Sequence, residues 1–167
     1  MKSTGEVMGI DKTFELAFLK AEESASCFLP AQGTVFLSVR DEDKAEIIRI
    51  ARQLGEAGFS LLATYGTARA LREQGLDCTG INKVAEGSPH IVDEIKAGRV
   101  GLVLNTTSSP QSIVDSFSLR RTALETRTPY FTTLAGAAAA ASASVARSHG
   151  PPTVRRLQDY LKELRGG

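Results

Sequence analysis

From Thr34 onward, short apolar runs alternate with longer runs that have helical periodicity. The sequence predicts strands over residues 35–39, 59–63, 77–81, 100–104 and 129–132, separated by helices over residues 43–57, 68–74, 90–97, 112–126 and 134–147. Strands that are apolar throughout are typical of a parallel sheet with helices on both faces. The alternation therefore predicts an α/β domain, in which ligands bind outside the carboxyl ends of the strands.

The predicted helices also indicate which side chains face the core. In the helix over 43–57, we expect Ala45, Ile48, either Ala51 or the stem of Arg52, and Leu54 to point inward. The alanine run over 137–141 is a strong helix former, and its small side chains favour close packing against a neighbour.

The first 33 residues differ from the rest. Residues 2–9 are loop-like, and a helix is predicted from Asp11, which we expect to be its N-cap. One helix without a strand partner cannot form a domain, so residues 1–33 are expected to be the end of an upstream unit, and 34–167 a domain of their own. After a break at 150–152, a last helix is predicted over 154–164, with an apolar stripe formed by Val154, Leu157, Leu161 and Leu164.

Composition excludes several classes of protein. The chain has 167 residues, 42% of them hydrophobic, which suffices for one domain with its own core. A formal net charge of +1 argues for neither nucleic acid nor membrane as a partner. Cys27 and Cys78 are too few for a disulfide framework and lack metal-ligand spacing. Without an apolar run long enough to span a membrane and without a signal peptide, the sequence predicts a cytoplasmic protein with no metal site.

Hydroxyl side chains follow two of the predicted strands. Thr64 and Thr67 lie between one strand and its helix, and residues 105–109 (Asn-Thr-Thr-Ser-Ser) follow another. Hydroxyls and helix N-terminal amides at such a junction can hold an anion such as phosphate. Either cluster alone is more typical of a helix cap. Their repetition, with Lys44 and Lys83 near two further junctions, predicts an anion site at this edge of the sheet, formed by Lys44, Thr64, Thr67, Lys83 and Thr107.

Some of these residues have a simpler interpretation. Lys44 and Lys83 could each be a solvated surface charge. Lys44, however, stands near a helix N-terminus, where cations are unfavourable, and an anionic ligand would remove that conflict. Ser38 could line the site or merely cap its strand. His90 follows a proline at a helix start and is expected to be a cap or packed histidine rather than a catalytic base.

Several short sequence words together resemble the C-terminal end of the carbamoyl-phosphate synthase large-subunit family. They occur in the family's order and cover nearly the whole chain: residues 3–9 (Ser-Thr-Gly-Glu-Val-Met-Gly), 37–40 with 43–44, 63–64 with 66–67, 82–84 with 86–87 and 89–91, 105–108 (Asn-Thr-Thr-Ser), 120–121 with 123–124, and 132–134. No single word is specific, but the ordered set is.

The resemblance implies a domain organisation. Residues 1–33 would be the end of the second ATP-grasp synthetase half, and residues 34–167 the allosteric domain, a three-layer, Rossmann-like domain of methylglyoxal-synthase-like fold with a five-stranded parallel sheet. The parent enzyme makes carbamoyl phosphate from bicarbonate, ATP and glutamine-derived ammonia for pyrimidine and arginine synthesis, with Mg or Mn beside its ATP. We therefore expect an excised regulatory piece without catalysis or cofactor, whose partners are the remainder of the large chain and the small glutaminase subunit.

The resemblance also implies an effector, a nucleotide monophosphate such as UMP or IMP. Its implied site residues are Ser38, Lys44, Thr64, Thr67, Lys83, Asn105, Thr106 and Thr107. The threonines and lysines would hold the phosphate, and Asn105 would suit ribose hydroxyls. Members that bind UMP or IMP often carry a basic pair after the Asn-Thr-Thr-Ser word, where this chain has Ser109-Pro110-Gln111, so the effector's identity stays open.

A second, interdomain site for ornithine is implied less completely. It would involve Glu6 on the synthetase side and Tyr130 and Thr132 on the regulatory side. The family's Tyr-Asp-Thr-Thr word reads Tyr-Phe-Thr-Thr here, so Phe131 replaces a carboxylate.

Two other functions remain as alternatives. A methylglyoxal synthase-type lyase on the same fold needs a carboxylate base beside the phosphate, and the corresponding stretch, 86–90 (Glu-Gly-Ser-Pro-His), lacks the family's aspartate. A non-binding interaction module would use the last helix, which is basic through Arg155, Arg156, Lys162 and Arg165. Phosphate or nucleotide binding separates an effector domain from an interaction module, whereas release of methylglyoxal from dihydroxyacetone phosphate would establish the lyase.

Overall fold

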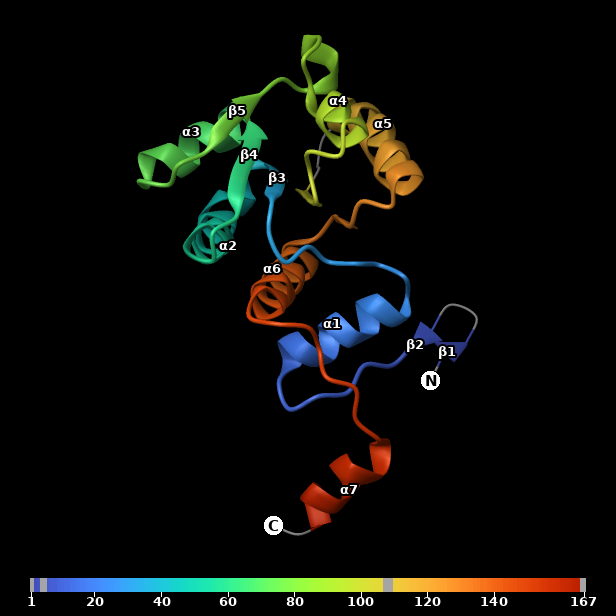
Figure 1. Cartoon of the computed structure of the whole chain (residues 1–167). Coiled ribbons are helices and arrows are strands. Elements are labelled where there is room, and N and C mark those ends of the chain that lie inside the picture. The colour runs from blue at the N-terminus through green and yellow to red at the C-terminus, as the bar shows by residue number, and fades with distance from the viewer. Residues whose placement is uncertain (1, 4–5, 107–109, 166–167) are drawn as a thin grey trace.

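A five-stranded parallel sheet forms the centre of the computed structural model, which describes residues 2–3, 6–106 and 110–165 (Figure 1). Its strands are β3 (Thr34–Ser38), β4 (Ser60–Thr64), β5 (Thr79–Ile81), β6 (Leu102–Asn105) and β7 (Tyr130–Phe131). Their order in the sheet is β5-β4-β3-β6-β7, and every neighbouring pair is parallel. The predicted fold class, α/β with a five-stranded parallel sheet, is confirmed.

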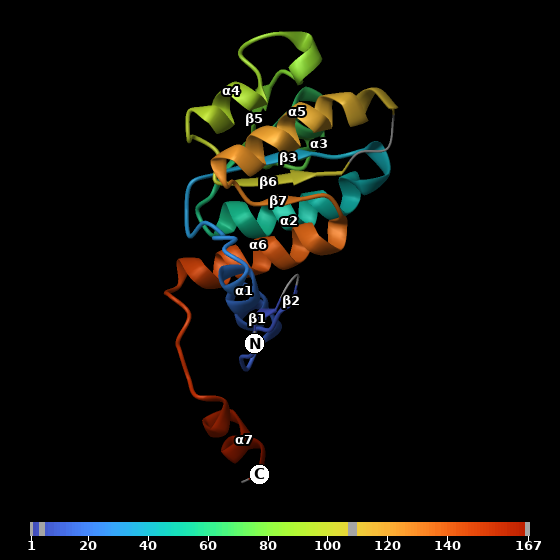
Figure 2. The ribbon, with the colours of Figure 1, turned by 90° about the vertical axis from the view of Figure 1, so that its right-hand side faces the viewer.

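Helices cover both faces of the sheet. They are α1 (Phe14–Ser24), α2 (Lys44–Glu56), α3 (Tyr65–Glu73), α4 (Ile91–Lys96), α5 (Pro110–Thr126), α6 (Leu134–Ser148) and α7 (Leu157–Arg165), with short 3-10 turns η1 (Asp41–Asp43) and η2 (Val84–Glu86). Helices α4 and α5 lie on one face, whereas α2 and α6 lie on the other, with α1 outside α6 (Figure 2).

Alternation along the strands divides the core into two clusters. On β3, Val35 and Leu37 pack in the cluster that contains the inner faces of α2 and α6, whereas Phe36 packs in the cluster with α4 and α5. All three side chains are at most 1% exposed, which is the burial expected for the central strand of a sheet covered on both faces. Removing this apolar surface from water is the main stabilising contribution to such a fold.

The predicted inner face of α2 was partly wrong. The buried residues of this helix are Ile47, Ile50, Ala51 and Leu54, which follow the i, i+3, i+4, i+7 spacing. Ala45 is exposed and Ile48 is half-buried. The observed face buries two isoleucines where the predicted face would bury one isoleucine and one alanine, so it removes more apolar surface from water.

The alanine-rich helix α6 packs closely, as predicted. Ala137, Ala140, Ala141 and Ala143 are at most 1% exposed, and α6 lies against both α1 and α2. Methyl side chains allow helix axes to approach closely, which lets α6 bridge the sheet layer and the N-terminal helix.

The N-terminal segment is more structured than predicted. Instead of a loop, residues 2–9 contain two short antiparallel strands, β1 (Lys2–Ser3) and β2 (Glu6–Val7). Asp11 is not the cap of α1: that helix begins at Phe14, and Thr13 caps it by accepting a hydrogen bond from the Leu16 amide. Asp11 instead pairs with Lys20 at 2.5 Å.

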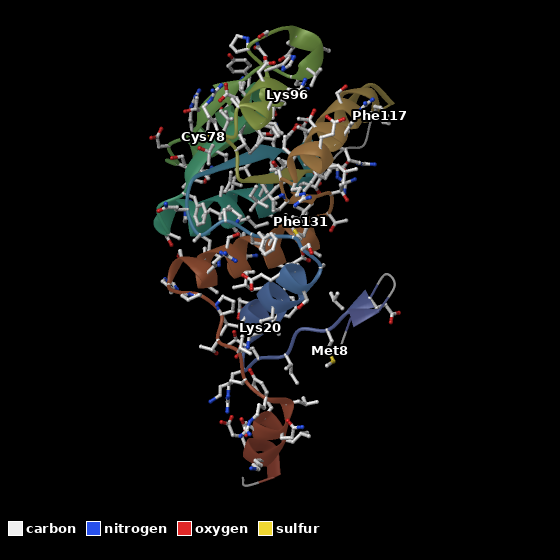
Figure 3. The ribbon with its side chains drawn as sticks, turned by 45° about the vertical axis from the view of Figure 1, so that its right-hand side comes forward. Met8, Lys20, Cys78, Lys96, Phe117 and Phe131 are labelled. Carbon is white, nitrogen blue, oxygen red and sulfur yellow. The ribbon has the colours of Figure 1, made fainter. Side chains whose placement is uncertain are left out.

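Helix α1 shares the core of the sheet domain. Leu19 is fully buried in the α2–α6 cluster, and the Phe18 ring lies 6.3 Å from that of Phe131 (Figure 3). Glu23 of α1 forms an ion pair with Arg147 of α6. The division at residue 33 stays a prediction about the origin of this segment.

Helix α7 begins later than predicted and uses a different inner residue. It starts at Leu157, and Val154 before it is 100% exposed. Of the α7 side chains that the structure describes, Tyr160 is buried, whereas Leu157 and Leu161 are exposed; the side chain of Leu164 lies outside the described ones. Tyr160 is contacted by Lys20 and by the Arg155 guanidinium, which lies 4.7 Å from the ring centre. No helix in the described part of the chain is long and apolar enough to cross a membrane.

Candidate functional site

The parallel register brings three of the predicted site residues to one edge of the sheet. Ser38 ends β3 and stands opposite Asn105, which ends β6. Thr64 ends β4, one position beyond the pair formed by Leu37 and Ala63. Because all the strands run the same way, these side chains meet at the carboxyl edge.

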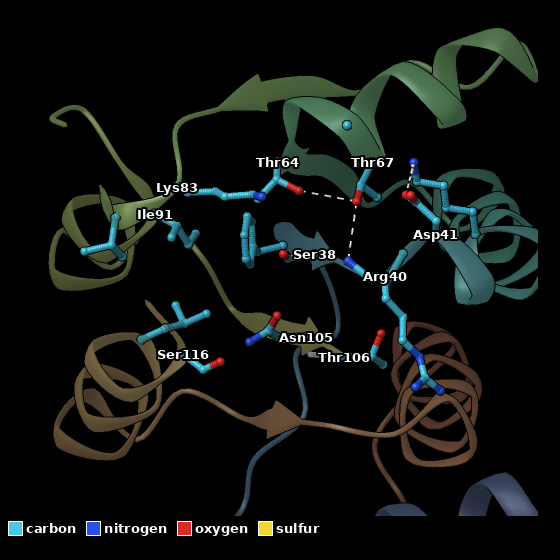
Figure 4. A pocket seen from close by; sticks show the side chains of 16 residues that line it. Ser38, Arg40, Asp41, Thr64, Thr67, Lys83, Ile91, Asn105, Thr106 and Ser116 are labelled. Carbon is cyan, nitrogen blue, oxygen red and sulfur yellow. Dashed lines mark hydrogen bonds and ion pairs between the residues drawn. The ribbon is translucent and has the colours of Figure 1, made fainter. Parts of the chain in front are cut away.

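A cavity of about 310 Å³ opens at this edge (Figure 4). It is lined by Phe36, Ser38, Val39, Arg40, Asp41, Lys44, Thr64, Gly66, Thr67, Lys83, Val84, Ile91, Asn105, Thr106, Ser116 and Leu119. Seven of the eight residues predicted for the effector thus lie around one cavity: Ser38, Lys44, Thr64, Thr67, Lys83, Asn105 and Thr106. The eighth, Thr107, lies outside the described residues.

The first hydroxyl cluster belongs to a helix start rather than a loop. Helix α3 begins at Tyr65, directly after Thr64, so the predicted start at Ala68 was three residues late. Thr64 donates its hydroxyl proton to Thr67 Oγ1 at 3.3 Å, and the Val39 amide donates to the same oxygen at 3.4 Å. Because Thr67 Oγ1 accepts two hydrogen bonds, its own proton can be donated to an anion beside the first turn of the helix.

A buried carboxylate, which sequence reasoning did not assign to the site, joins two strand ends. Asp43 is 4% exposed, and its Oδ2 accepts hydrogen bonds from Arg40 Nε at 2.7 Å and from Thr106 Oγ1 at 2.6 Å. The hydrogen bond from Arg40, with a further one from Thr106, lowers the pKa of the Asp43 carboxyl despite its burial. The loop after β3 is thereby tied to the residue after β6.

Two lysines approach the cavity from different junctions. Lys44, the first residue of α2, pairs with Asp41 Oδ1 at 2.7 Å. Lys83 extends toward Thr64 from the segment between β5 and η2, where its backbone amide donates to Glu86 Oε2 at 2.8 Å (Figure 4). Two ammonium groups and a helix start with hydroxyls make this edge suited to a phosphate.

One wall of the cavity is apolar. Phe36 comes from β3, Val84 from η2, Ile91 from the start of α4 and Leu119 from α5. An apolar wall next to a cationic, hydroxyl-rich mouth can take a ligand with a flat ring at one end and an anionic group at the other. The sequence did not indicate these residues, because core and wall residues have the same apolar character.

The second strand-end amide contacts the edge strand of the sheet. Asn105 is 4% exposed, and its Nδ2 donates to Tyr130 Oη at 2.6 Å. Tyr130 therefore supports the cavity from behind but does not line it, and Thr132 is exposed beyond β7. Glu6 is exposed on β2, in the hairpin on the α1 side of the molecule (Figure 2). None of these three lines the cavity.

His90 takes a structural position. It is the N-cap residue of α4, where its backbone amide donates to Asp93 Oδ2 at 3.0 Å. Cys78 is buried, and burial raises the pKa of its thiol to about 11, so it is a poor nucleophile at neutral pH. The described residues contain no cluster of three or more potential metal ligands.

Comparison with known proteins shows the family and the fold of this chain. Residues 46–132, more than half of the chain, match the MGS-like domain family, and the chain belongs to that family. A crystal structure of methylglyoxal synthase from Elizabethkingia anophelis NUHP1 superimposes with a TM-score of 0.56, covering 80% of this chain and 93% of that one at 16% identity, so the likeness is one of fold.

Relatives found by sequence identify one protein within this class. The chain is 49% identical over 162 residues to the carbamoyl phosphate synthase large chain of Brucella suis biovar 1 and 51% identical over 162 residues to that of Rhizobium meliloti, covering 97% of this chain and 14% of each relative. A relative from Methanopyrus kandleri, described as the C-terminal section of the large chain, is 47% identical over 163 residues. The match covers 97% of this chain and 30% of that relative. The chain therefore matches the C-terminal section of the large chain, as the sequence words predicted.

Proposed function

We propose that this chain is the regulatory, effector-binding domain of a carbamoyl phosphate synthase large chain and that the cavity takes a nucleotide monophosphate such as UMP or IMP. One observation carries the proposal: Lys44, Lys83, Thr64 and Thr67, from three separate junctions, line the same cavity. The part that these four residues line is the cationic, hydroxyl-rich mouth of the cavity. The phosphate would lie at this mouth, and the base would lie toward the apolar wall.

Direct titration tests the proposal. Calorimetry with UMP, IMP, ornithine and N-acetylglutamate is expected to show binding of at least one nucleotide monophosphate. The matching nucleoside should bind much more weakly, because it lacks the group that the two lysines recognise. Equal binding of nucleotide and nucleoside, or binding of neither nucleotide, would contradict an effector role for this cavity.

The lyase alternative has less support from the geometry. Of the described residues that line the cavity, Asp41 alone carries a carboxylate, and it is paired with Lys44. The hydrogen bond from Lys44 lowers the pKa of Asp41, which makes it a weaker base for moving protons on a triose phosphate. Release of methylglyoxal from dihydroxyacetone phosphate would nevertheless establish the lyase and replace the present proposal.

The interaction-module alternative is also weakened. Two of the arginines that make the last helix segment basic are paired within the chain: Arg155 with Glu163 at 2.5 Å and Arg156 with Asp159 at 3.1 Å. Such pairs neutralise the basic face locally and reduce its use as a docking surface.

Regulation should require the rest of the large chain. An effector changes activity only by distinguishing two states of the whole enzyme, and this chain spans about 14% of the full-length relatives it matches. We expect the chain to bind effector without making carbamoyl phosphate from bicarbonate, ATP and ammonia. ATP with Mg or Mn, the glutaminase subunit and any ornithine site belong to the larger assembly in this proposal.

Glu6→Ala tests the predicted coupling between residues 1–33 and the sheet domain. In the full-length enzyme it should change the effector response, whereas effector affinity in the isolated chain should stay within about twofold, because Glu6 does not line the cavity. Activity titrations with and without effector measure the response. Unchanged regulation in the full-length variant would show that the coupling does not involve Glu6.

A further inference from the structure

An anionic side chain already occupies the mouth of the cavity. Asp41, the first residue of η1, lines the cavity, and its Oδ1 lies 2.7 Å from Lys44 Nζ. Lys83 points into the cavity from the opposite side in Figure 4. The hydrogen bond from Lys44, followed by its charge and that of Lys83, lowers the pKa of the Asp41 carboxyl. Both candidate phosphate-binding lysines therefore act on one carboxylate of the same chain.

We propose that Asp41 is an internal counter-ion, which an effector's phosphate must displace from Lys44. In the absence of effector, it pairs with the Lys44 ammonium and offsets the unfavourable position of that charge at the start of α2. When the effector binds, its phosphate takes over both roles. This inference rests on the proposed function, because it concerns the same cavity.

Exposure makes Asp41 displaceable. Its side chain is 92% exposed, whereas that of Lys44 is 28% exposed. An exposed ion pair contributes little stability, because water solvates both partners and salt screens them. The carboxylate can thus turn into solvent at small cost and leave the ammonium in place for the phosphate.

Asp43 shows the contrasting case two residues later. Its side chain is 5% exposed, and two donors, Arg40 Nε and Thr106 Oγ1, share one of its oxygens. Leaving this position would deprive the buried Thr106 hydroxyl of its acceptor and break the ion pair with Arg40, so Asp43 stays in place when ligand binds. The two carboxylates beside the cavity therefore have different roles: Asp43 holds the strand ends together, and Asp41 competes with the ligand.

Removing the charge of Asp41 should strengthen phosphate binding. Asp41→Asn keeps the size and shape of the side chain but abolishes its repulsion of an incoming phosphate, which carries about −1.5 to −2 charges at pH 7. We expect the variant to bind UMP and inorganic phosphate about threefold to tenfold more tightly than the wild type, measured by calorimetry at fixed pH and ionic strength. Uridine should bind both proteins equally.

Glu42→Gln is the matched control. This substitution changes the net charge by the same amount as Asp41→Asn, one position further along the chain. The Glu42 side chain is 82% exposed, contacts Arg40 at 3.7 Å and does not line the cavity. Its affinity for UMP should stay within about twofold of the wild type. In a protein that already carries Lys44→Ala, Asp41→Asn should give little of this gain in phosphate affinity. The carboxylate of Asp41 and the phosphate of the ligand would then no longer compete for the Lys44 ammonium.

The outcomes separate this inference from the proposed function. A gain confined to phosphorylated ligands, specific to Asp41 and dependent on Lys44, supports the counter-ion role. Equal effects of Asp41→Asn and Glu42→Gln, weaker binding in Asp41→Asn, or an equal gain for uridine would overturn it while UMP still binds the wild type. If UMP, IMP and inorganic phosphate all fail to bind the wild type, Asp41→Asn and Glu42→Gln, the proposed function itself fails.

Discussion

Replacing Lys83 by alanine is expected to weaken binding of the nucleotide monophosphate by about 1.5–3 kcal/mol, the range for a hydrogen bond to a charged group, or roughly tenfold to 150-fold in affinity. Lys83 reaches the cavity from the segment after β5, opposite Asp41 in Figure 4. It would therefore contribute an ammonium group that Lys44 cannot supply from its own side. Calorimetric titration of UMP or IMP measures the change.

The nucleoside and a distant lysine provide the controls. Uridine or inosine should be nearly indifferent to Lys83→Ala, because neither carries the phosphate. Lys96 is an exposed lysine in the last turn of α4 (Figure 3). The Lys96→Ala variant loses the same charge as Lys83→Ala, but its affinity for the nucleotide should stay near that of the wild type. Equal losses for nucleotide and nucleoside would show that Lys83 does not meet the phosphate.

Asp43→Asn is expected to lower the free energy of unfolding by about 1.5–3 kcal/mol near pH 7. The substitution keeps the size of the side chain but removes the charge that receives hydrogen bonds from Arg40 and Thr106. Because the carboxylate is 4% exposed, water cannot readily replace these partners. Urea denaturation, followed by the midpoint and slope of the transition, measures the loss.

The same variant should change the pH dependence of stability in a defined direction. The hydrogen bond from Arg40 lowers the pKa of Asp43 in the folded state below the value of about 3.9 in the unfolded chain. The carboxylate therefore contributes its full stability above about pH 5, and the contribution is lost as pH falls from there through the folded pKa. The stability difference between wild type and Asp43→Asn should be constant above about pH 5 and shrink in more acidic solution.

Asp77→Asn separates this effect from a general change of charge. Asp77 is exposed in the segment between α3 and β5, away from the cavity-lining residues. The control should leave the unfolding free energy at pH 7 within about 0.5 kcal/mol of the wild type, as is usual for surface substitutions. A loss in Asp43→Asn that equals the control, or one that grows on acidification, would show that the buried carboxylate does not stabilise the strand ends.

Asp43 holds cavity-lining residues from two strand ends in place, because it accepts hydrogen bonds from Arg40 and Thr106. Residues 38–44 hold a strand end, three carboxylates and a helix start within one short segment. Asp43 links the segments that follow β3 and β6, and Asp41, in our proposal, regulates access to Lys44. The cavity can therefore be tuned by substitutions that leave the sheet unchanged.

The sequence alone determined the alternation of elements, since a parallel sheet covered on both faces requires apolar strands and amphipathic helices. It also located the hydroxyl clusters and lysines at strand-to-helix junctions, because such junctions need hydrogen-bonding side chains. Its ordered family words identified the C-terminal section of the large chain. These features are local, and each can be recognised within a short stretch of residues.

Tertiary structure decided what is not local. Strand order and register depend on which surfaces pack together in the folded chain. The register of β3 and β6 places Ser38 beside Asn105, which the sequence alone does not show. The inward face of α2 contains Ile47 and Ile50 in place of the predicted Ala45 and Ile48, because the packing of the helix on the sheet sets its rotation. Asp43 became part of the site because folding brings Thr106, 63 residues away in sequence, within 2.6 Å of a carboxylate that water cannot reach. A sequence pattern records side-chain type and spacing, whereas burial and partnership are properties of the packed chain.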